Sequence, residues 1–218
     1  MDMLGEGLGR YFSLAALSAL RAAHVGVIGA GGLGSNVAMM LVRSGLRQLT
    51  IADPDRVDAS NLNRQAYFPE DVGKPKIQAL ARHLAALEPA IRLVTHETAI
   101  TRANARSLFA ACPLIVEAVD LAETKVMLYE LFAPEKDLYV TASGMGGCGK
   151  DKDTVMVCRR PRPNVAAVGD FNTAVGFGAP PLAPRVMQAA AMQADAVLDY
   201  ILSPVADLEG HYENISKD

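Results

Sequence analysis

A short apolar run followed at once by four closely spaced glycines constrains this chain more than any other feature. The run covers residues 25–28, and the glycines are Gly29, Gly31, Gly32 and Gly34. Such a run is typical of a strand buried on both faces of a sheet. The glycines predict a tight turn into a helix over residues 35–44, which Gly45 ends. At such a turn the N–H groups that begin the helix are open to a phosphate.

A second predicted strand ends in an acidic residue. Residues 49–52 form the strand, and Asp53 follows them, 19 residues after Gly34. An acid in this place commonly holds a ribose hydroxyl. Residues 29–34, GAGGLG, also match the dinucleotide fingerprint. An NAD- or FAD-dependent oxidoreductase is therefore one interpretation of this region.

The segment after this acid favours different chemistry. Asn61, Arg64 and Lys76 lie in a polar stretch that Gly73 and Pro75 interrupt. Arginine offers phosphate a planar fork and lysine a compact charge, and this combination suits a triphosphate that undergoes substitution. A pyrophosphate that is bound without reacting needs fewer such cationic groups. The segment indicates reaction at phosphorus rather than hydride transfer.

Four motifs follow one another along this part of the chain: GAGGLGS at 29–35, DPD at 53–55, NLNRQ at 61–65 and GKPK at 73–76. Together they resemble the ThiF/MoeB/HesA family, relatives of the ubiquitin-activating enzymes. Later segments resemble the short ThiF-type members: EAVDLAETK at 117–125, SGMGG at 143–147 and PLAPRV at 181–186. The resemblance runs from residue 25 to residue 202.

This resemblance implies an ATP-dependent adenylyltransferase that activates the C-terminal glycine carboxylate of a small ubiquitin-like sulfur-carrier protein of the ThiS type. It implies that Asp53 holds the ribose and that Asn61, Arg64 and Lys76 grip the phosphates. Phosphate would also be cradled by the glycines of the turn, namely Gly29, Gly31, Gly32 and Gly34. The implied fold is α/β, a Rossmann-like doubly wound, mostly parallel sheet with helices on both faces.

The resemblance also assigns Asp120 to the Mg²⁺ that accompanies ATP, which makes Arg64, Lys76 and Asp120 the expected catalytic residues. The alternative role for Asp120 is an N-cap of the helix predicted over residues 122–132. A homodimer is expected from the family. Arg10 is the candidate for an arginine that reaches the partner's triphosphate, and its alternative is a solvated tail residue.

Composition agrees with one α/β domain. The 218 residues are 50% hydrophobic with no second composition regime, so we expect a single domain over 1–218, with an arm and helix at 1–24, a core at 25–202 and a tail at 203–218. A net charge of −3 and a pI near 5.8 disfavour a nucleic-acid partner. No apolar run approaches the roughly 20 residues that span a bilayer. With no signal sequence either, we expect a cytoplasmic protein without a membrane partner.

The remaining pattern alternates between strands and helices, which predicts parallel strands. Expected strands cover residues 92–95, 114–116, 138–142 and 154–159, and expected helices cover residues 14–23, 76–87, 102–110 and 185–202. Two loops separate the later elements, a glycine-rich one at 143–153 and a long one at 170–184.

The cysteines give little support to a covalent step after adenylation. Cys112, Cys148 and Cys158 are an odd count without a C-x-x-C pair, so no structural zinc is expected. Family members that form a thioester or persulfide place the cysteine in the loop before the last helix, and residues 170–184 contain none. A non-catalytic scaffold that binds the carrier is the other class left open beside the oxidoreductase.

Overall fold

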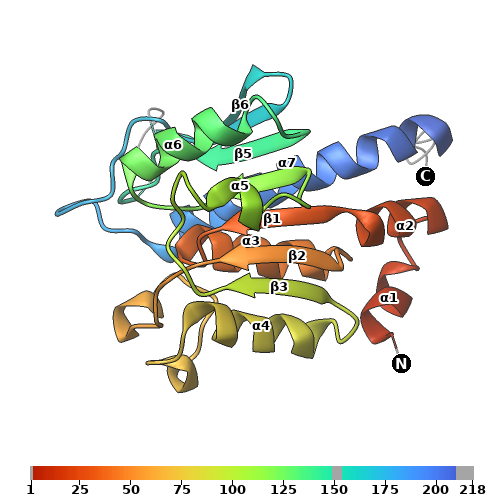
Figure 1. The fold of residues 1–218 in the computed structure, drawn as a ribbon, viewed down its shortest axis with the longest axis horizontal. Coiled ribbons are helices and arrows are strands. Elements are labelled where there is room, and N and C mark those ends of the chain that lie inside the picture. Colours follow the sequence, from red (N-terminus) through yellow and green to blue (C-terminus); the bar gives the residue numbers. More distant parts are fainter. Residues whose placement is uncertain (1, 149–153, 210–218) are drawn as a thin grey trace, which may run out of the picture.

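One seven-stranded sheet, in the order β3-β2-β1-β4-β5-β7-β6, organises the computed structural model, which describes residues 2–148 and 154–209, without the side chains of 206–209 (Figure 1). All neighbouring strands pair in parallel except β6 and β7, which are antiparallel. The strands are β1 (His24–Ile28), β2 (Gln48–Ala52), β3 (Arg92–His96), β4 (Leu114–Glu117), β5 (Leu138–Ala142), β6 (Val157–Arg162) and β7 (Val165–Gly169).

Helices cover both faces of this sheet, which confirms the doubly wound α/β fold. The longer helices α3, α4 and α7 share one hydrophobic core, and α5 and α6 contribute to a second core on the other face. The helices are α1 (Met3–Leu8), α2 (Leu14–Ala22), α3 (Gly32–Arg43), α4 (Lys76–Leu87), α5 (Ala105–Leu108), α6 (Ala122–Phe132) and α7 (Ala183–Glu209), with 3₁₀ turns η1 (Ala59–Asn61) and η2 (Pro69–Asp71). No helix of the described part of the chain is long and apolar enough to span a membrane.

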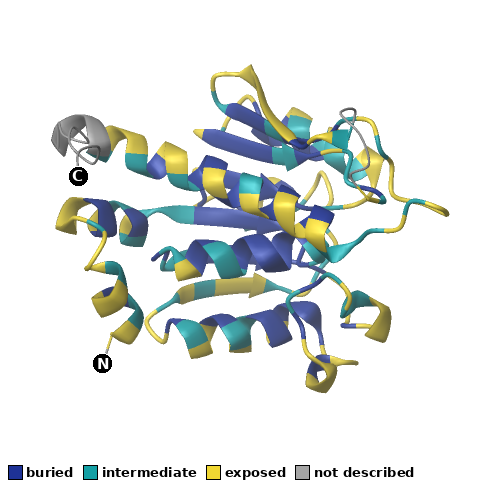
Figure 2. Cartoon of the chain, turned by 180° about the vertical axis from the view of Figure 1, so that it is seen from behind, coloured by how far each residue is buried: buried dark blue, intermediate teal, exposed yellow. Residues whose placement is uncertain are grey.

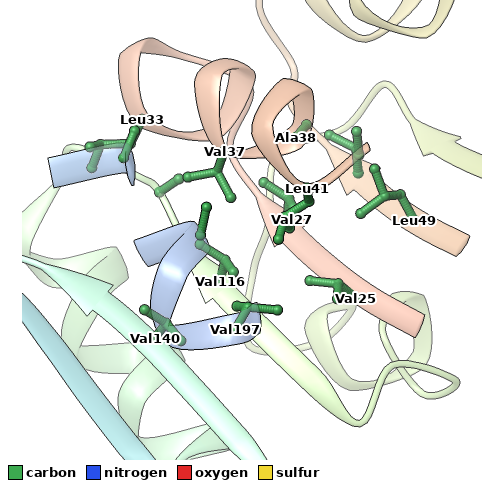
Figure 3. Packing of buried hydrophobic residues seen from close by; sticks show 14 of the residues in the cluster. Val25, Val27, Leu33, Val37, Ala38, Leu41, Leu49, Val116, Val140 and Val197 are labelled. Carbon is green, nitrogen blue, oxygen red and sulfur yellow. The ribbon is translucent and has the colours of Figure 1, made fainter. Parts of the chain in front are cut away.

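Alternation along β1 shows how the sheet separates the two cores. Val25 and Val27 belong to the core beneath α3 and α7, whereas Ile28 belongs to the core beneath α5 and α6. Figure 3 shows the first of these cores, where valines of β1, β4 and β5 meet Val37 of α3 and Val197 of α7. In Figure 2 the central strands are buried, while the edge strands β3 and β6 are largely exposed.

The sheet has a topological switch point at β1. From β1 the chain passes outward through β2 to β3, then returns across the sheet to β4 on the other side of β1. The loops that follow β1 and β4 therefore leave in opposite directions, and open α/β sheets bind ligands in the crevice that results. We call the edge where β1, β2 and β4 end the carboxyl edge. In Figure 1 the segments 53–75 and 170–182 project from it on the left.

Several element predictions were wrong at the amino end and in the middle of the chain. Helix α1 was not predicted, and the helix expected over 102–110 is only the single turn α5. The strand expected over 154–159 begins at Val157 and continues through Arg162, and β7 was not predicted at all. All six residues of β6 are exposed, so the strand carries no apolar alternation, and an edge position tolerates its Pro161.

The last helix was also predicted too short. Helix α7 begins at Ala183 and continues through Pro204 to Glu209, so the predicted helix bounds of 185–202 were wrong. Proline lacks the N–H that a helix interior uses, so a helix that continues through Pro204 is not what this residue type favours. Ser203 and Pro204 are exposed, so water can satisfy the carbonyl that proline leaves unpaired. The helix α4, the strand β5 and the irregular segment 170–182 agree with expectation, and residues 149–153 of the glycine-rich loop lie outside the described part.

Candidate functional site

The glycine turn brings β1 directly onto α3. Gly29 has a φ of +97°, a left-handed conformation that glycine adopts without strain, and its N–H bonds to the carbonyl of Ala52 at 2.9 Å. A Cβ on Gly34 would collide with the carbonyl oxygen of Gly29, so only glycine allows the first turn of α3 to lie this close. The N-cap Gly31 has no side chain to cap the helix. The N–H groups that open α3 are thus available to an anion.

Asp53 links the end of β2 to this turn. Asp53 is 5% exposed, and its carboxylate accepts hydrogen bonds from the N–H of Ala30 at 2.7 Å and of Asp55 at 2.8 Å. Burial raises the pKa of the Asp53 carboxyl above its ordinary value, because desolvation disfavours the charged form more than the two N–H donors favour it. Each carboxylate oxygen keeps a further lone pair, so Asp53 can still accept a bond from a ribose hydroxyl.

Lys76 is the first residue of α4 and lies beside this acid. The Lys76 residue is 6% exposed, and its Nζ is 2.8 Å from Oδ2 of Asp55 and 4.0 Å from Oδ1 of Asp53. The N–H of Lys76 also bonds to the carbonyl of Asp55 at 2.9 Å, which fixes the start of α4 against the DPD motif. A buried cation is therefore held next to the predicted ribose acid.

The segment with the NLNRQ motif is fastened to the first two turns of α3. Nδ2 of Asn36 donates to the carbonyl of Arg64 at 2.9 Å, and Oγ of Ser35 accepts from the N–H of Ala66 at 3.0 Å. Ser35 and Asn36 are buried at 0% and 7% exposure. Two side chains of α3 thereby set the position of the backbone that carries Arg64.

Arg64 and Asn61 come from this fastened segment. The aliphatic part of Arg64 lies over Gly32, where a Cβ would be 3.6 Å from its Cγ. The guanidinium donates to Oδ1 of Asn63 at 2.7 Å and to the carbonyl of Ser60 at 3.2 Å. Oδ1 of Asn61 accepts from the N–H of residue 58 at 3.0 Å, so only its amide NH₂ remains for a phosphate. Arg64 thus lies at the start of α3, whereas Asn61 is engaged in its own turn.

A further anchor holds the chain between Arg64 and Lys76. Asp71 is fully buried and contacts Arg82 at 2.6 Å and His83 at 2.7 Å, both on α4. Burial acts to raise its pKa, but the hydrogen bonds from the N–H of Phe68 and from His83 and the charge of Arg82 outweigh it and hold the pKa of Asp71 below the ordinary value. The segment before Lys76 is therefore fixed to the helix that Lys76 begins.

Asp120 lies on the loop after β4, on the other side of the switch point. It is exposed, and α6 has Leu121 as N-cap without a side-chain hydrogen bond, so the structure does not show Asp120 as a cap. Buried Glu117 supports the loop: its carboxylate accepts from Nζ of Lys125 at 2.8 and 2.9 Å and from Oγ1 of Thr141 at 2.6 Å. This network was not predicted, although both Glu117 and Lys125 lie in the segment that carried the resemblance.

The donor set around Asp120 fits a metal ion that arrives with a phosphate ligand. Among residues 2–148 and 154–209, no group of three or more His, Cys, Asp and Glu side chains gathers as a metal site. Magnesium is commonly held by one or two carboxylates together with water and substrate phosphates, so a single exposed carboxylate suits it. Asp120 is the residue that would hold Mg²⁺ here.

Arg10 takes no part in this site within one chain, and the three cysteines differ in exposure. The segment between α1 and α2, which carries exposed Arg10, lies at the end of the molecule opposite the carboxyl edge (Figure 1). Cys112 is buried in the core, whereas Cys148 and Cys158 are exposed.

This fold, with a glycine turn between β1 and α3 at the switch point, is typical of nucleotide-binding α/β proteins. The chain belongs to the ThiF family, whose model matches residues 8–216. It is 38% identical over 110 residues to the sulfur carrier protein adenylyltransferase of Thermus thermophilus, covering 50% of this chain and 41% of the relative. It is 32% identical over 143 residues to the tRNA threonylcarbamoyladenosine dehydratase of Haemophilus influenzae, covering 65% of this chain and 55% of the relative.

The structure resembles that of the E. coli tRNA N6-threonylcarbamoyladenosine dehydratase in complex with ATP. The TM-score is 0.82 at 21% sequence identity, and the match covers 94% of this chain and 96% of the other. At this identity the likeness shows the fold alone. The two curated relatives above are matched over only about half of their own lengths.

Proposed function

We propose that this protein is an ATP-dependent adenylyltransferase that activates a carboxylate. The observation that carries the proposal is the cluster at the start of α3. Arg64 lies over Gly32 there, and buried Lys76 lies within 4.0 Å of Asp53. In this assignment Asp53 holds the ribose, and Arg64, Lys76 and the open N–H groups of α3 bind the phosphates. Asn61 contributes its free amide NH₂.

The reaction that this site suits is substitution at the α-phosphorus. A substrate carboxylate oxygen forms a bond to the phosphorus while the bond to the pyrophosphate oxygen breaks, giving an acyl-adenylate and pyrophosphate. A carboxylate is ionised at neutral pH, so no general base is required. The site has only to align the reactants and to stabilise charge in the transition state. The cations of Arg64 and Lys76 do both as negative charge redistributes. Mg²⁺ at Asp120 would shield the phosphate oxygens.

The substrate that we favour is the C-terminal carboxylate of a small ubiquitin-like sulfur carrier. The Thermus thermophilus relative is named for that activity, and the net charge of −3 offers little attraction to a polyanionic tRNA. The second candidate is a carboxylate on a modified tRNA nucleoside. Its support is the Haemophilus relative and the structural match over nearly all of both chains. A homodimer, with Arg10 of one subunit near the phosphates of the other, is the assembly we propose.

The test is exchange of labelled pyrophosphate into ATP, measured with no addition, with a ThiS-type carrier, and with tRNA bearing threonylcarbamoyladenosine. We expect exchange only with the carrier. Exchange that requires the tRNA instead would move the assignment to the second candidate. Tight carrier binding without exchange would indicate a scaffold, and a bound nicotinamide or flavin in the purified protein would indicate an oxidoreductase.

A further inference from the structure

A buried ion pair lies directly beneath the loop that carries Asp120. Glu117 is the last residue of β4 and is fully buried, and its carboxylate accepts from Nζ of Lys125 at 2.8 and 2.9 Å. Lys125 lies near the start of α6, and its side chain is 25% exposed. The two charges are thus largely removed from water, and each needs the other as its counter-ion.

The Lys125 ammonium spends its hydrogen bonds on the protein itself. Besides the two oxygens of Glu117, it donates to the carbonyl of Ala142 at 3.1 Å. An ammonium group has three N–H donors, and these three acceptors match them. Ala142 ends β5, the neighbour of β4 in the sheet. Lys125 therefore ties segments of the chain together and leaves no donor for a substrate group.

The pair fixes the backbone on both sides of Asp120. Oε1 of Glu117 also accepts from the N–H of Val119 at 2.8 Å, and the N–H of Lys125 bonds to the carbonyl of Leu121 at 3.0 Å. Asp120 lies between these two anchored residues. Its own side chain is exposed and makes no hydrogen bond or ion pair within the described part of the chain. The position of Asp120 is therefore held while its carboxylate stays free to bind.

The same loop packs against the glycine turn. The N–H of Ala118 bonds to the carbonyl of Ile28 at 2.8 Å, and a Cβ on Gly29 would lie 2.7 Å from the carbonyl oxygen of Ala118. On the side of α7, Nε2 of Gln193 donates to the carbonyl of Glu117 at 2.9 Å. The ion pair supplies the remaining support, on the side of α6 and β5.

We propose that the ion pair of Glu117 and Lys125 is a positioning element for Asp120, which holds this carboxylate in place to bind the Mg²⁺ that accompanies the nucleotide. The inference rests on the proposed function for the presence of that ion. Groups that orient a metal ligand without touching the metal commonly change metal affinity by roughly 10- to 100-fold. Breaking the pair should therefore weaken only the part of nucleotide binding that depends on Mg²⁺.

The measured quantity is the Mg²⁺ gain, defined as the ratio of the ATP dissociation constants in EDTA and in Mg²⁺, both from calorimetric titration. Lys125→Met removes the cation and keeps the length of the side chain. Glu117→Gln keeps the shape of the carboxylate but has one oxygen, so one of the two ends that face Nζ becomes a donor. Urea unfolding shows that the variants are folded, and Glu117→Gln, which leaves no buried carboxylate without a counter-ion, decides the test if Lys125→Met does not fold.

The matched control is Glu88→Gln at the opposite edge of the sheet. Glu88 is 3% exposed and pairs with Nε of Arg47, the residue before β2, at 2.9 Å. Its carboxylate also accepts from the N–H of Ala90, two residues on, at 2.9 Å. It therefore has the burial, the ion pair and the local bond of Glu117 without the proximity to Asp120.

We expect Lys125→Met and Glu117→Gln each to lower the Mg²⁺ gain about tenfold or more, with the affinity for ATP in EDTA unchanged. Glu88→Gln should keep the gain of the wild type. In an Asp120→Asn background neither change should lower the gain further, because the pair acts through Asp120. The proposal is overturned if the gain is unchanged in both variants, falls equally in Glu88→Gln, or falls again in the Asp120→Asn background.

These titrations also separate the positioning role from adenylation. If the wild type binds ATP with a Mg²⁺ gain but never exchanges pyrophosphate, adenylation is refuted and the gain of the variants still decides the role of the pair. If the wild type exchanges pyrophosphate but binds ATP equally well in EDTA and in Mg²⁺, the positioning role is overturned and adenylation stands. Absence of ATP binding by the wild type would overturn both.

Discussion

The ion pair between Asp170 and Arg185 joins the loop after β7 to α7. We expect it to stabilise the fold strongly, because both side chains are buried. The side chain of Asp170 is 0% exposed and that of Arg185 is 8% exposed. The carboxylate also accepts from the N–H groups of Asn172 and Thr173, each at 2.8 Å, and from the Thr173 hydroxyl. Asp170→Asn would keep the shape of the group but remove its charge, leaving a buried guanidinium without a counter-ion.

The expected cost follows from this burial. Removing one partner of a buried ion pair costs about 3–5 kcal/mol, and Asn keeps one acceptor oxygen, so we expect roughly 3 kcal/mol for Asp170→Asn. At a denaturant slope near 2 kcal/mol per molar, the urea midpoint should fall by roughly 1.5 M. The loop from Asp170 and the start of α7 should loosen first. Since Val186 contacts Gly32, that change would reach the glycine turn.

The effect should depend on pH in a defined direction. Burial acts to raise the pKa of Asp170, but the bonds from Thr173 and Asn172 and the charge of Arg185 outweigh it and hold the pKa below its ordinary value. A carboxyl whose pKa is lowered on folding stabilises the protein above the unfolded pKa and loses that contribution as pH falls through the folded pKa. The gap between wild type and Asp170→Asn should be full near pH 7 and shrink below about pH 4.

Urea unfolding followed by circular dichroism at pH 7 and pH 3.5 measures both effects. The control is Asp199→Asn, which breaks the exposed pair between Asp199 and Arg160 on α7 and β6. Exposed pairs contribute at most about 1 kcal/mol, so the control midpoint should barely move. If Asp170→Asn lowers the free energy of unfolding no more than the control does, the buried ion pair does not stabilise the fold as expected.

Three further predictions concern the site itself. Asp53→Ala should weaken ATP binding by about 1.5–3 kcal/mol in calorimetric titration; unchanged ATP affinity together with new NAD binding would contradict the ribose assignment. Arg64→Ala and Lys76→Ala should each slow pyrophosphate exchange about 100-fold while the protein stays folded; parent rates in both would remove the phosphate site. A variant that combines Cys112→Ser, Cys148→Ser and Cys158→Ser should keep the full rate of pyrophosphate exchange. A covalent adduct between protein and carrier that a thiol reagent reverses, and that Cys148→Ser alone abolishes, would refute this prediction.

The parts of the fold that depend on residues close together in the sequence were predicted correctly. The glycine turn and the position of Asp53 follow from one strand, one turn and the next strand, so their proximity could be inferred from residues 25–53. The boundaries of α4 follow from Pro75 and an apolar face without interruption. Strand β7 was missed because two of its five residues are alanines and the last is a glycine, residue types that are depleted in strands.

Side-chain contacts between segments far apart in the chain could not be predicted from the sequence. Asp170 and Arg185 are separated by a loop without periodicity, and nothing in their spacing indicates that both are buried. Likewise, the motif containing Glu117 and Lys125 indicated Asp120 but not the buried network that supports its loop.

The central claim is that this site joins a carboxylate to the α-phosphorus of ATP. Its most direct measurement is mass spectrometry of a ThiS-type carrier after incubation with the protein and ATP labelled with heavy oxygen at the α-phosphate. The account predicts a carrier bearing one labelled adenylyl group at its C-terminal carboxylate, formed by the wild type and strongly reduced in Arg64→Ala. A carrier that remains unmodified, or an adenylyl group that forms equally in the wild type and Arg64→Ala, would contradict it.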